Sequence, residues 1–444
     1  MRRIARASLA TWPRPSQVLV ALASVGSCLG ATTPAVTASA GRLTPAVLGA
    51  PSVDRAAFLH YGDLAFVSEG GLWAFDGATG RLSLLAPASE QPSLGEFSPN
   101  GRWLSYSVGT GQVWVAGADG RPRRPVTSGG GGQWLPDGDL VAGGDVWHIP
   151  LVGPPERTGA LPTGLVAWSA AGDRFAFESD SLVISHTKPS SGTDRLEVSG
   201  SLAGRRVTWY QSKVSFSSYS GAQGNFLDLV RVLPQKKGIV FTLDPYRSAS
   251  LAADGLDLYE VRAPGGTAVK LGTTVGDTVA LGPPGMFSFT NGPNRYAWVT
   301  KSVVTCSLSS GTCSPVPAPA GQLTLGPAWS PNGAILAYEE APTSLASSFY
   351  QPTVQRWYAA HTLWLLRDGE RTPVEIRAAN GASAPVWSAD SKSLMYVADN
   401  SLWLLPTLSS KPVHIESPLF TPGAWPNYYG QVDWAAQFAW LSPR

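Results

Sequence analysis

A motif of the form aromatic-Ser-Pro-Asn-Gly, followed by a short apolar run, recurs along this chain of 444 residues. Its clearest copy is WSPNGAILAYE, which starts at Trp329. The related copies are FSPNGRWLSYS from Phe97, WLPDGDLVAGG from Trp134, WSAAGDRFAFES from Trp168, WSADSKSLMYVA from Trp387 and the closing AWLSP from Ala439. A unit that recurs in this way is typical of similar supersecondary elements that bury their apolar faces against one another.

The spacing of the copies gives the size of the repeated unit. Phe97 and Trp134 are 37 residues apart, and Trp134 and Trp168 are 34 residues apart. The 161 residues from Trp168 to Trp329 correspond to about four such units. No helical periodicity persists over about 12 residues after the leader, and 48 Gly and 37 Pro are spread along the chain. This pattern predicts short strands joined by tight turns.

A second recurring element is a short apolar strand, usually with an aromatic residue at its second or third position. Its eight copies are Gly71–Phe75, Gln112–Ala116, Asp145–Ile149, Ser181–Ser185, Asp257–Val261, Ser302–Cys306, Thr362–Leu366 and Ser401–Leu405. Asp-Gly turns follow several copies, and Asp-Gly between apolar arms indicates a hairpin. We interpret the eight copies as the innermost strands of successive units.

A period of about 35 to 45 residues with about four strands per unit predicts an all-β fold, a β-propeller of four-stranded antiparallel blades. Eight inner-strand candidates favour eight blades. Seven is the alternative, if one unit between Leu182 and Leu258 is an insertion. Within this fold we expect Trp329 to end the outer strand of one blade and Ile335 to Tyr338 to begin the innermost strand of the next. The motif would then be a joint between blades.

These residues carry a family resemblance. WSPNGAILAYE, followed by an aromatic strand and a DG turn, resembles the TolB-type propeller repeat, a WD40-like unit. The match covers roughly residues 55–185 and 325–444 and is poor between them. The same repeat caps prolyl oligopeptidases, but the repeats here run almost to the last residue, which leaves no room for a hydrolase domain. The resemblance therefore implies the propeller and not the peptidase.

The first 27 residues have the features of an export signal. Four arginines precede an apolar run over residues 18–27, which is shorter than the roughly 20 residues that span a bilayer. The sequence VGSC that ends at Cys28 resembles a bacterial lipobox, in which the cysteine is lipidated after cleavage. The alternatives are cleavage after the A-x-A site over residues 38–40, which gives a freely secreted or periplasmic protein, and a Cys28 that is simply one more small residue of the leader.

We therefore predict a signal peptide over residues 1–27, a flexible tether over residues 28–55 and the propeller over residues 56–444. Removal of the leader leaves 29 basic and 31 acidic residues, a net charge of −2, which argues against a nucleic-acid surface. Cys306 and Cys313 flank a turn between strand-like arms, so we expect a hairpin disulfide in an exported protein. One C-x6-C pair without a nearby His does not have zinc-site spacing.

No catalytic motif stands out. The five His lie far apart, and the chain has no HExxH, no G-x-S-x-G elbow and no Walker or dinucleotide glycine pattern after a strand. The carboxylates are sparse and lie mostly in turns, so no acid/base pair can be named. We therefore predict no catalytic residue, no metal ligand and no cofactor.

Three segments break the repeat, and such breaks are where function tends to lie. They are residues 244–259, 341–362 and 420–434. Their candidate binding residues are Asp244, Tyr246, Arg247, Tyr350, Trp357, Tyr358, Trp425, Tyr428 and Tyr429. Aromatic-rich loops suit carbohydrate stacking or protein contact, and they equally suit a plug between the first and last blades. If the three segments meet on one rim of the propeller, that rim is the predicted binding surface.

The leading hypothesis is an extracytoplasmic, membrane-anchored and monomeric propeller that binds a protein or a cell-wall glycan and carries out no catalysis. One alternative is a propeller enzyme that acts on a polysaccharide or a lactone in the axial channel, usually with a metal held by inward His, Asp or Glu. Another is a TolB-like component of an envelope complex, which rests on fold analogy alone.

Overall fold

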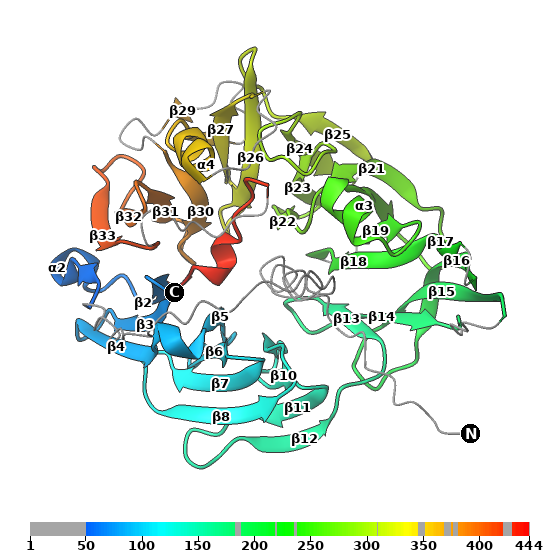
Figure 1. The fold of residues 1–444 in the computed structure, drawn as a ribbon, viewed down its shortest axis with the longest axis horizontal. Helices are drawn as coiled ribbons and strands as arrows, with labels where there is room; N and C mark the ends of the chain where they lie inside the picture. The colour runs from blue at the N-terminus through cyan, green and yellow to red at the C-terminus, as the bar shows by residue number, and fades with distance from the viewer. Residues whose placement is uncertain are drawn as a thin grey trace, which may run out of the picture.

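The computed structural model describes residues 50–182, 188–217, 220–234, 238–308, 310–344, 351–367, 374–375, 381–420 and 429–443. In these residues the strands form eight antiparallel sheets around a central axis (Figure 1). Six sheets have four strands and two have five. Each sheet is one blade, so the chain is an eight-bladed β-propeller and the seven-bladed alternative is wrong.

We number the blades 1 to 8 along the chain. Blade 1 contains β2 Asp63–Ser68, β3 Gly71–Asp76 and β4 Arg81–Ala86, and blade 2 contains β5 Ser93–Phe97, β6 Trp103–Val108, β7 Gln112–Gly117 and β8 Arg123–Ser128. Blade 3 contains β9 Gln133–Trp134, β10 Leu140–Ala142, β11 Asp145–His148 and β12 Glu156–Ala160. Blade 4 contains β13 Leu165–Trp168, β14 Phe175–Asp180, β15 Ser190–Ser199, β16 Val207–Ser217 and β17 Gly221–Gly224. Blade 5 contains β18 Phe226–Val232, β19 Ile239–Asp244, β20 Leu256–Val261 and β21 Val269–Thr274, and blade 6 contains β22 Ala280–Leu281, β23 Met286–Asn291, β24 Ser302–Ser307 and β25 Thr312–Pro315. Blade 7 contains β26 Gln322–Trp329, β27 Ile335–Pro342, β28 Thr362–Arg367 and β29 Val374–Glu375. Blade 8 contains β30 Ser383–Trp387, β31 Leu394–Ala398, β32 Ser401–Leu405 and β33 Val413–Ser417.

Both ends of the described chain close the ring. The C-terminal strand β34, Phe438–Leu441, pairs with β2 and supplies the innermost strand of blade 1. The N-terminal strand β1, Ser52–Val53, pairs with β33 as a fifth strand of blade 8. Apolar side chains of the two blades pack between them, among them Leu64 and Phe66 of blade 1 and Met395 and Leu404 of blade 8. The propeller is therefore fastened at its inner and outer edges, and its fold begins before the boundary predicted at residue 56.

The repeated motif is a hairpin within one blade, so the expected joint between blades is wrong. Trp329 ends β26, the innermost strand of blade 7, and pairs with Leu336 of β27 in the same sheet. The Ser330 hydroxyl accepts a hydrogen bond from the Ile335 amide at 3.0 Å, which fastens the turn. This turn therefore connects two neighbouring strands of one antiparallel sheet.

The motif nevertheless joins blades through its tryptophan side chain. The indole Nε1 of Trp168 donates to the Trp134 carbonyl at 3.2 Å, and that of Trp387 donates to the Ala328 carbonyl at 3.0 Å. In both cases the acceptor lies on the innermost strand of the preceding blade. The motif is therefore a turn within one blade, and its tryptophan donates a hydrogen bond to the preceding blade.

The recurring aromatic segments lie two strand positions further out than expected. Seven of the eight overlap the third strand of a blade, namely β3, β7, β11, β20, β24, β28 and β32, and not the innermost strand. The eighth, Ser181–Ser185, is not a third strand, because Ser181 follows β14 and the third strand of blade 4 is β15. Eight blades are present, but only seven of the eight segments identify a third strand, because the third strand of blade 4, β15, has a polar sequence.

Cys306 and Cys313 face each other in β24 and β25 and form the predicted hairpin disulfide. The remaining helical elements are α2 Arg55–Phe58, α3 Ala249–Asp254, α4 Gln351–Tyr358, η1 Ala88–Glu90 and η3 Trp434–Ala436. Among the described residues, no helix has the length and apolar character needed to cross a membrane. Cys28 and the predicted leader lie outside the described residues.

Candidate functional site

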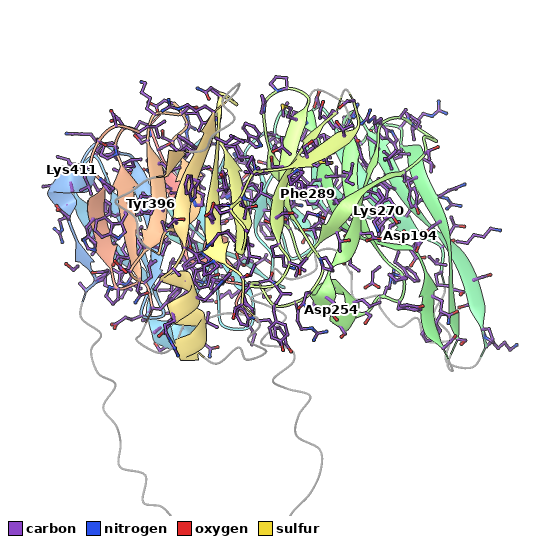
Figure 2. The ribbon with its side chains drawn as sticks, turned by 90° about the horizontal axis from the view of Figure 1, so that it is seen from above. Asp194, Asp254, Lys270, Phe289, Tyr396 and Lys411 are labelled. Carbon is purple, nitrogen blue, oxygen red and sulfur yellow. A yellow bond between two sulfur atoms is a disulfide. The ribbon has the colours of Figure 1, made fainter. Side chains whose placement is uncertain are left out.

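The two rims of the propeller differ in construction. One rim carries the connections between first and second strands and between third and fourth strands, which include the repeated motif; we call it the turn rim. The other carries the connections between second and third strands and between successive blades; we call it the loop rim. Helices α3 and α4 both lie on the loop rim, at the lower edge in Figure 2, where Asp254 of α3 is labelled.

The three segments that break the repeat meet on this loop rim. Helix α3 contacts the connection between β23 and β24, where Arg295 forms a two-point ion pair with Asp254 at 2.6 Å. The same connection accepts the segment after blade 8, because the Ala297 amide donates to the Tyr429 carbonyl at 3.0 Å. Helix α4 reaches that segment too, since the Tyr358 hydroxyl donates to the Gly430 carbonyl at 2.9 Å. All three irregular segments therefore contribute to the loop rim.

Of the three candidate residues near α3, one is exposed to solvent and two make contacts within the protein. Tyr246 is 55% exposed. Asp244 is buried, and its carboxylate accepts hydrogen bonds from the Tyr246 and Ser248 amides, so it shapes the corner before α3. Arg247 lies over the ring of Phe226 and contacts Asp180 at 2.9 Å. Arg247 is 24% exposed, and its guanidinium joins blades 4 and 5.

Arg247 is the cation of an acidic cluster that the sequence did not reveal. Glu178 lies 3.6 Å from its guanidinium, and Asp194 is fully buried nearby. Burial raises the pKa of Glu178 to about 7 and the pKa of Asp194 to about 6. Arg247 opposes both shifts. Spacing along the chain could not have found this cluster, because strand pairing of β14 with β15 brings its acids together.

The aromatic candidates of α4 form a core. Trp357 and Tyr358 are 7% and 6% exposed and pack against Trp298 of blade 6. The Trp357 indole donates to the Pro342 carbonyl at 2.9 Å. These two side chains anchor α4 and do not display a surface. Tyr350 lies outside the described residues.

Beneath α4 lies a buried polar group that no motif indicated. The Nδ1 atom of His361 lies 3.0 Å from a Glu339 carboxylate oxygen and 3.1 Å from the Ser383 hydroxyl. The other Glu339 oxygen accepts the Ala384 amide at 2.9 Å. These contacts link blade 7 to blade 8, and the ring of Trp357 covers the imidazole edge-on at 4.3 Å. His361 thus orders the loop rim from within.

The segment before β34 closes the inner side of the rim. Tyr429 packs edge-on against Tyr296 at 5.3 Å and lies under the Arg295 guanidinium. Trp434 of η3 packs on Tyr358, and η3 lies inside the ring between β5 and β26 (Figure 1). This described part fits the plug that was the alternative interpretation of the segment. Trp425 and Tyr428 lie outside the described residues.

Lys301 fixes the connection that all three segments touch. It is buried, and its Nζ donates to the carbonyls of Gly292, Pro293 and Asn294 at 2.7, 2.9 and 2.6 Å. Burial lowers its pKa to about 8. Across the described residues, His, Cys, Asp and Glu form no group of three that could hold a metal ion.

No protein-family model and no curated protein matches the chain. Solved structures resemble it in fold. TolB from Acinetobacter baumannii is 12% identical over 71% of this chain and 63% of its own, with a TM-score of 0.33. An oligogalacturonate lyase in complex with manganese is 11% identical over 84% of this chain and 89% of its own, with a TM-score of 0.41. A prolyl endopeptidase is 13% identical over 83% of this chain and 52% of its own, with a TM-score of 0.41.

The chain thus spans less than two thirds of that TolB and about half of that endopeptidase. At such identities the likeness is one of fold and carries no argument about activity. The propeller fold and the eight-bladed assignment rest on the sheet topology of the chain itself.

Proposed function

We propose that this chain is an exported propeller that binds a protein or cell-envelope ligand through its loop rim and acts by binding, without catalysing a reaction. One observation carries the proposal: all three segments that were predicted to break the repeat contribute described residues to the same rim, while the connections of the turn rim are mostly hairpins. Binding residues concentrate on irregular connections that a rigid scaffold positions.

Two features support an extracytoplasmic location within this proposal. The predicted leader has the layout of an export signal, and the Cys306–Cys313 disulfide suits an oxidising compartment. A lipid on Cys28 would hold the propeller at the membrane. The described fold begins with Ser52 of β1, at the loop-rim end of blade 8, so the tether would join the propeller on that side.

A matched pair of surface variants tests the binding rim. Tyr246 is 55% exposed on the loop rim, and Val152 is 88% exposed on the turn rim. We expect Tyr246→Arg to weaken co-sedimentation of the exported protein with isolated envelope fractions by at least about tenfold, in the range of an interface aromatic. Val152→Arg should leave it unchanged. Equal binding by both variants, or a loss with Val152→Arg alone, would overturn the proposal.

The anchor has its own test. Cys28→Ala should move the protein from the membrane fraction to the soluble fraction, and intact-mass measurement should show that the acyl mass is gone. A wild-type protein without any acyl mass would remove the anchor from the proposal and leave the rim test untouched.

A further inference from the structure

Blade 4 extends beyond its neighbours at the loop rim. Its strands β15 and β16 have 10 and 11 residues, whereas the strands of blade 3 have between 2 and 5. The pairing of β14 with β15 stops at Asp180 and Asp194, but β15 continues to pair with β16 as far as Ser190 and Phe216. The long green strands at the lower right of Figure 2 show this extension, to which β17 adds a third strand.

The two faces of the extension have different chemistry, because side chains alternate along a strand. Val214 and Phe216 face blade 5 and pack with Leu182 and Phe226. The opposite face carries five polar side chains from three strands: Ser191, Thr193, Lys213, Ser215 and Gln223. Because blade 3 is short, it leaves this polar face open.

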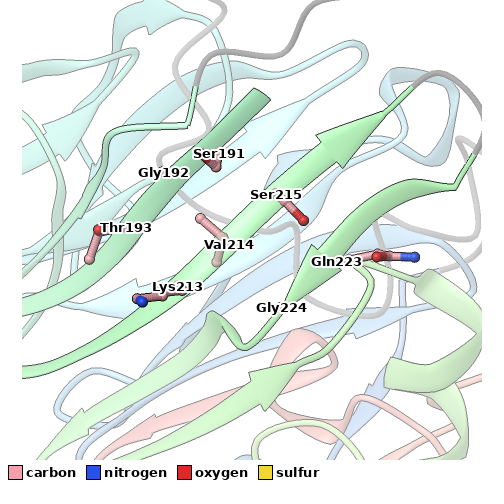
Figure 3. Close-up of a pocket in the computed structure, with 8 residues that line it drawn as sticks. All are labelled: Ser191, Gly192, Thr193, Lys213, Val214, Ser215, Gln223 and Gly224. Atoms are coloured by element: carbon pink, nitrogen blue, oxygen red, sulfur yellow. The ribbon is translucent and has the colours of Figure 1, made fainter. Parts of the chain in front are cut away.

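Register brings the five polar side chains into two rows. Ser191 pairs with Ser215, and Ser215 pairs with Gln223. Thr193 pairs with Lys213 in the next row. The rows line a hollow of about 500 Å³, in which Figure 3 shows the side chains and the strands that carry them.

In the described part of the chain, these five side chains keep their hydrogen-bonding capacity free. Within the described residues, none of them has a hydrogen-bond or ion-pair partner in another side chain or in the backbone. Three hydroxyls can each donate and accept, one amide can do both, and the ammonium of Lys213 donates and carries a positive charge. Arg195 continues the same face one row nearer the propeller body, opposite Gln211.

We propose that this hollow binds an anionic polyol, a polymer of sugar or alditol units that carry carboxylate or phosphate groups. Hydroxyls and an amide on rigid strands match ligand hydroxyls, and Lys213 with Arg195 matches a carboxylate or a phosphate. The inference rests on the proposed function, since it names a ligand class and a place for it on the loop rim. It adds a site on blade 4 that the three loop segments do not include.

The test uses the exported protein and three immobilised polymers: alginate as the polyuronate, poly(glycerol phosphate) as the polyol phosphate and dextran as the neutral control. We expect saturable binding to at least one anionic polymer, at least about tenfold weaker binding to dextran, and weakening by added salt. Binding to alginate alone identifies a carboxylate ligand, and binding to poly(glycerol phosphate) alone identifies a phosphate ligand.

Three variants locate the binding. Lys213→Glu should lower affinity at least about tenfold, because it reverses a charge in the hollow. Ser215→Trp should abolish binding, because the indole would fill the hollow. Lys411→Glu makes the same charge change on the turn rim and should leave affinity unchanged. Thermal unfolding within a few degrees of wild type shows that each variant is folded.

The outcomes separate this inference from the function on which it rests. Binding to neither anionic polymer, equal loss with Lys411→Glu, or unchanged binding with Lys213→Glu and Ser215→Trp would overturn the inference. If envelope fractions still bind in a manner that depends on Tyr246 but not on Lys213, the loop-rim function stands and the hollow is excluded as its site. A loss of envelope binding with Val152→Arg alone would remove both.

Discussion

The turn rim and the loop rim are made by the same strands, yet their polar groups are arranged differently. On the turn rim a serine of the motif closes several hairpins locally, as Ser330 and Ser388 do for the amides of Ile335 and Ser393. On the loop rim the polar contacts join residues far apart in the sequence, as Arg247 joins Asp180. Local contacts repeat with the sequence, whereas distant ones depend on which blades become neighbours. The motif serines therefore stabilise the turn rim locally, whereas the loop rim holds ionisable groups whose pKa values burial shifts, among them Glu178, Asp194 and Lys301.

The largest expected effect tests the stability of the turn-rim side. Trp387 is 8% exposed and packs with Leu363 and Tyr396. Its indole donates a hydrogen bond to blade 7. We expect Trp387→Ala to lower the free energy of unfolding by about 3–5 kcal/mol, as for other buried tryptophans. Denaturant unfolding at pH 6 and pH 8 should give the same loss. A loss that varied strongly with pH would break the contrast between the rims.

Glu416 tests the loop-rim side of the ring seam. It is fully buried in β33 beside Val53 of β1, and burial raises its pKa to about 8 against a smaller opposing effect of the Ser68 hydroxyl. The folded state then holds a proton that the unfolded state releases, so stability falls as the pH rises from about 4.5 to about 8. Glu416→Gln should stabilise the protein at pH 9 by on the order of 3 kcal/mol and have little effect at pH 4.5. An equal effect at both values would contradict the assignment.

The disulfide on the turn rim of blade 6 tests whether this rim contributes to stability without contributing to binding. Cys306 and Cys313 close a short loop, and loops of this length contribute about 2–3 kcal/mol. We expect the double serine variant to unfold at lower denaturant concentration by that amount, with binding to envelope fractions unchanged. Reduction of the wild-type protein should reproduce the shift. Loss of binding in a folded double variant would place recognition on the wrong rim.

The smallest effect concerns Arg247. Arg247→Ala removes the cation that opposes the raised pKa values of Glu178 and Asp194. Both acids are protonated in the folded state at pH 5 and ionise as the pH rises through about 6 to 7, so the loss should be about 2 kcal/mol at pH 8 and smaller at pH 5. Arg247→Lys, which keeps the charge, should lose less. Equal losses at the two pH values would show that Arg247 acts through packing alone.

Much of the fold was predictable, because it depends on local patterns. The tight turn after Trp329 and the pairing of Cys306 with Cys313 both follow from residues close together in the sequence. The order of strands within a blade was not predictable in the same way. A strand followed by a turn and a strand looks the same whether the turn lies within a blade or between two blades.

The candidate site divides along the same line. The three irregular segments share the loop rim, and Tyr246 is exposed there. Trp357 and Tyr358 are core residues instead, since an aromatic cluster serves a buried helix as well as a binding surface. His361 with Glu339, and the acids around Arg247, gave no signal because their partners are many residues away in the sequence.

By itself the sequence determined the repeat, the tight turns and the disulfide, because each of these is set by residues within one repeated unit. Only the tertiary structure decided which strand is innermost, that both chain ends fasten the ring, and that all three irregular segments share one rim. It also decided that the polar face of blade 4 stays open beside its short neighbour. Those outcomes depend on contacts between units, and only closure of the ring creates such contacts.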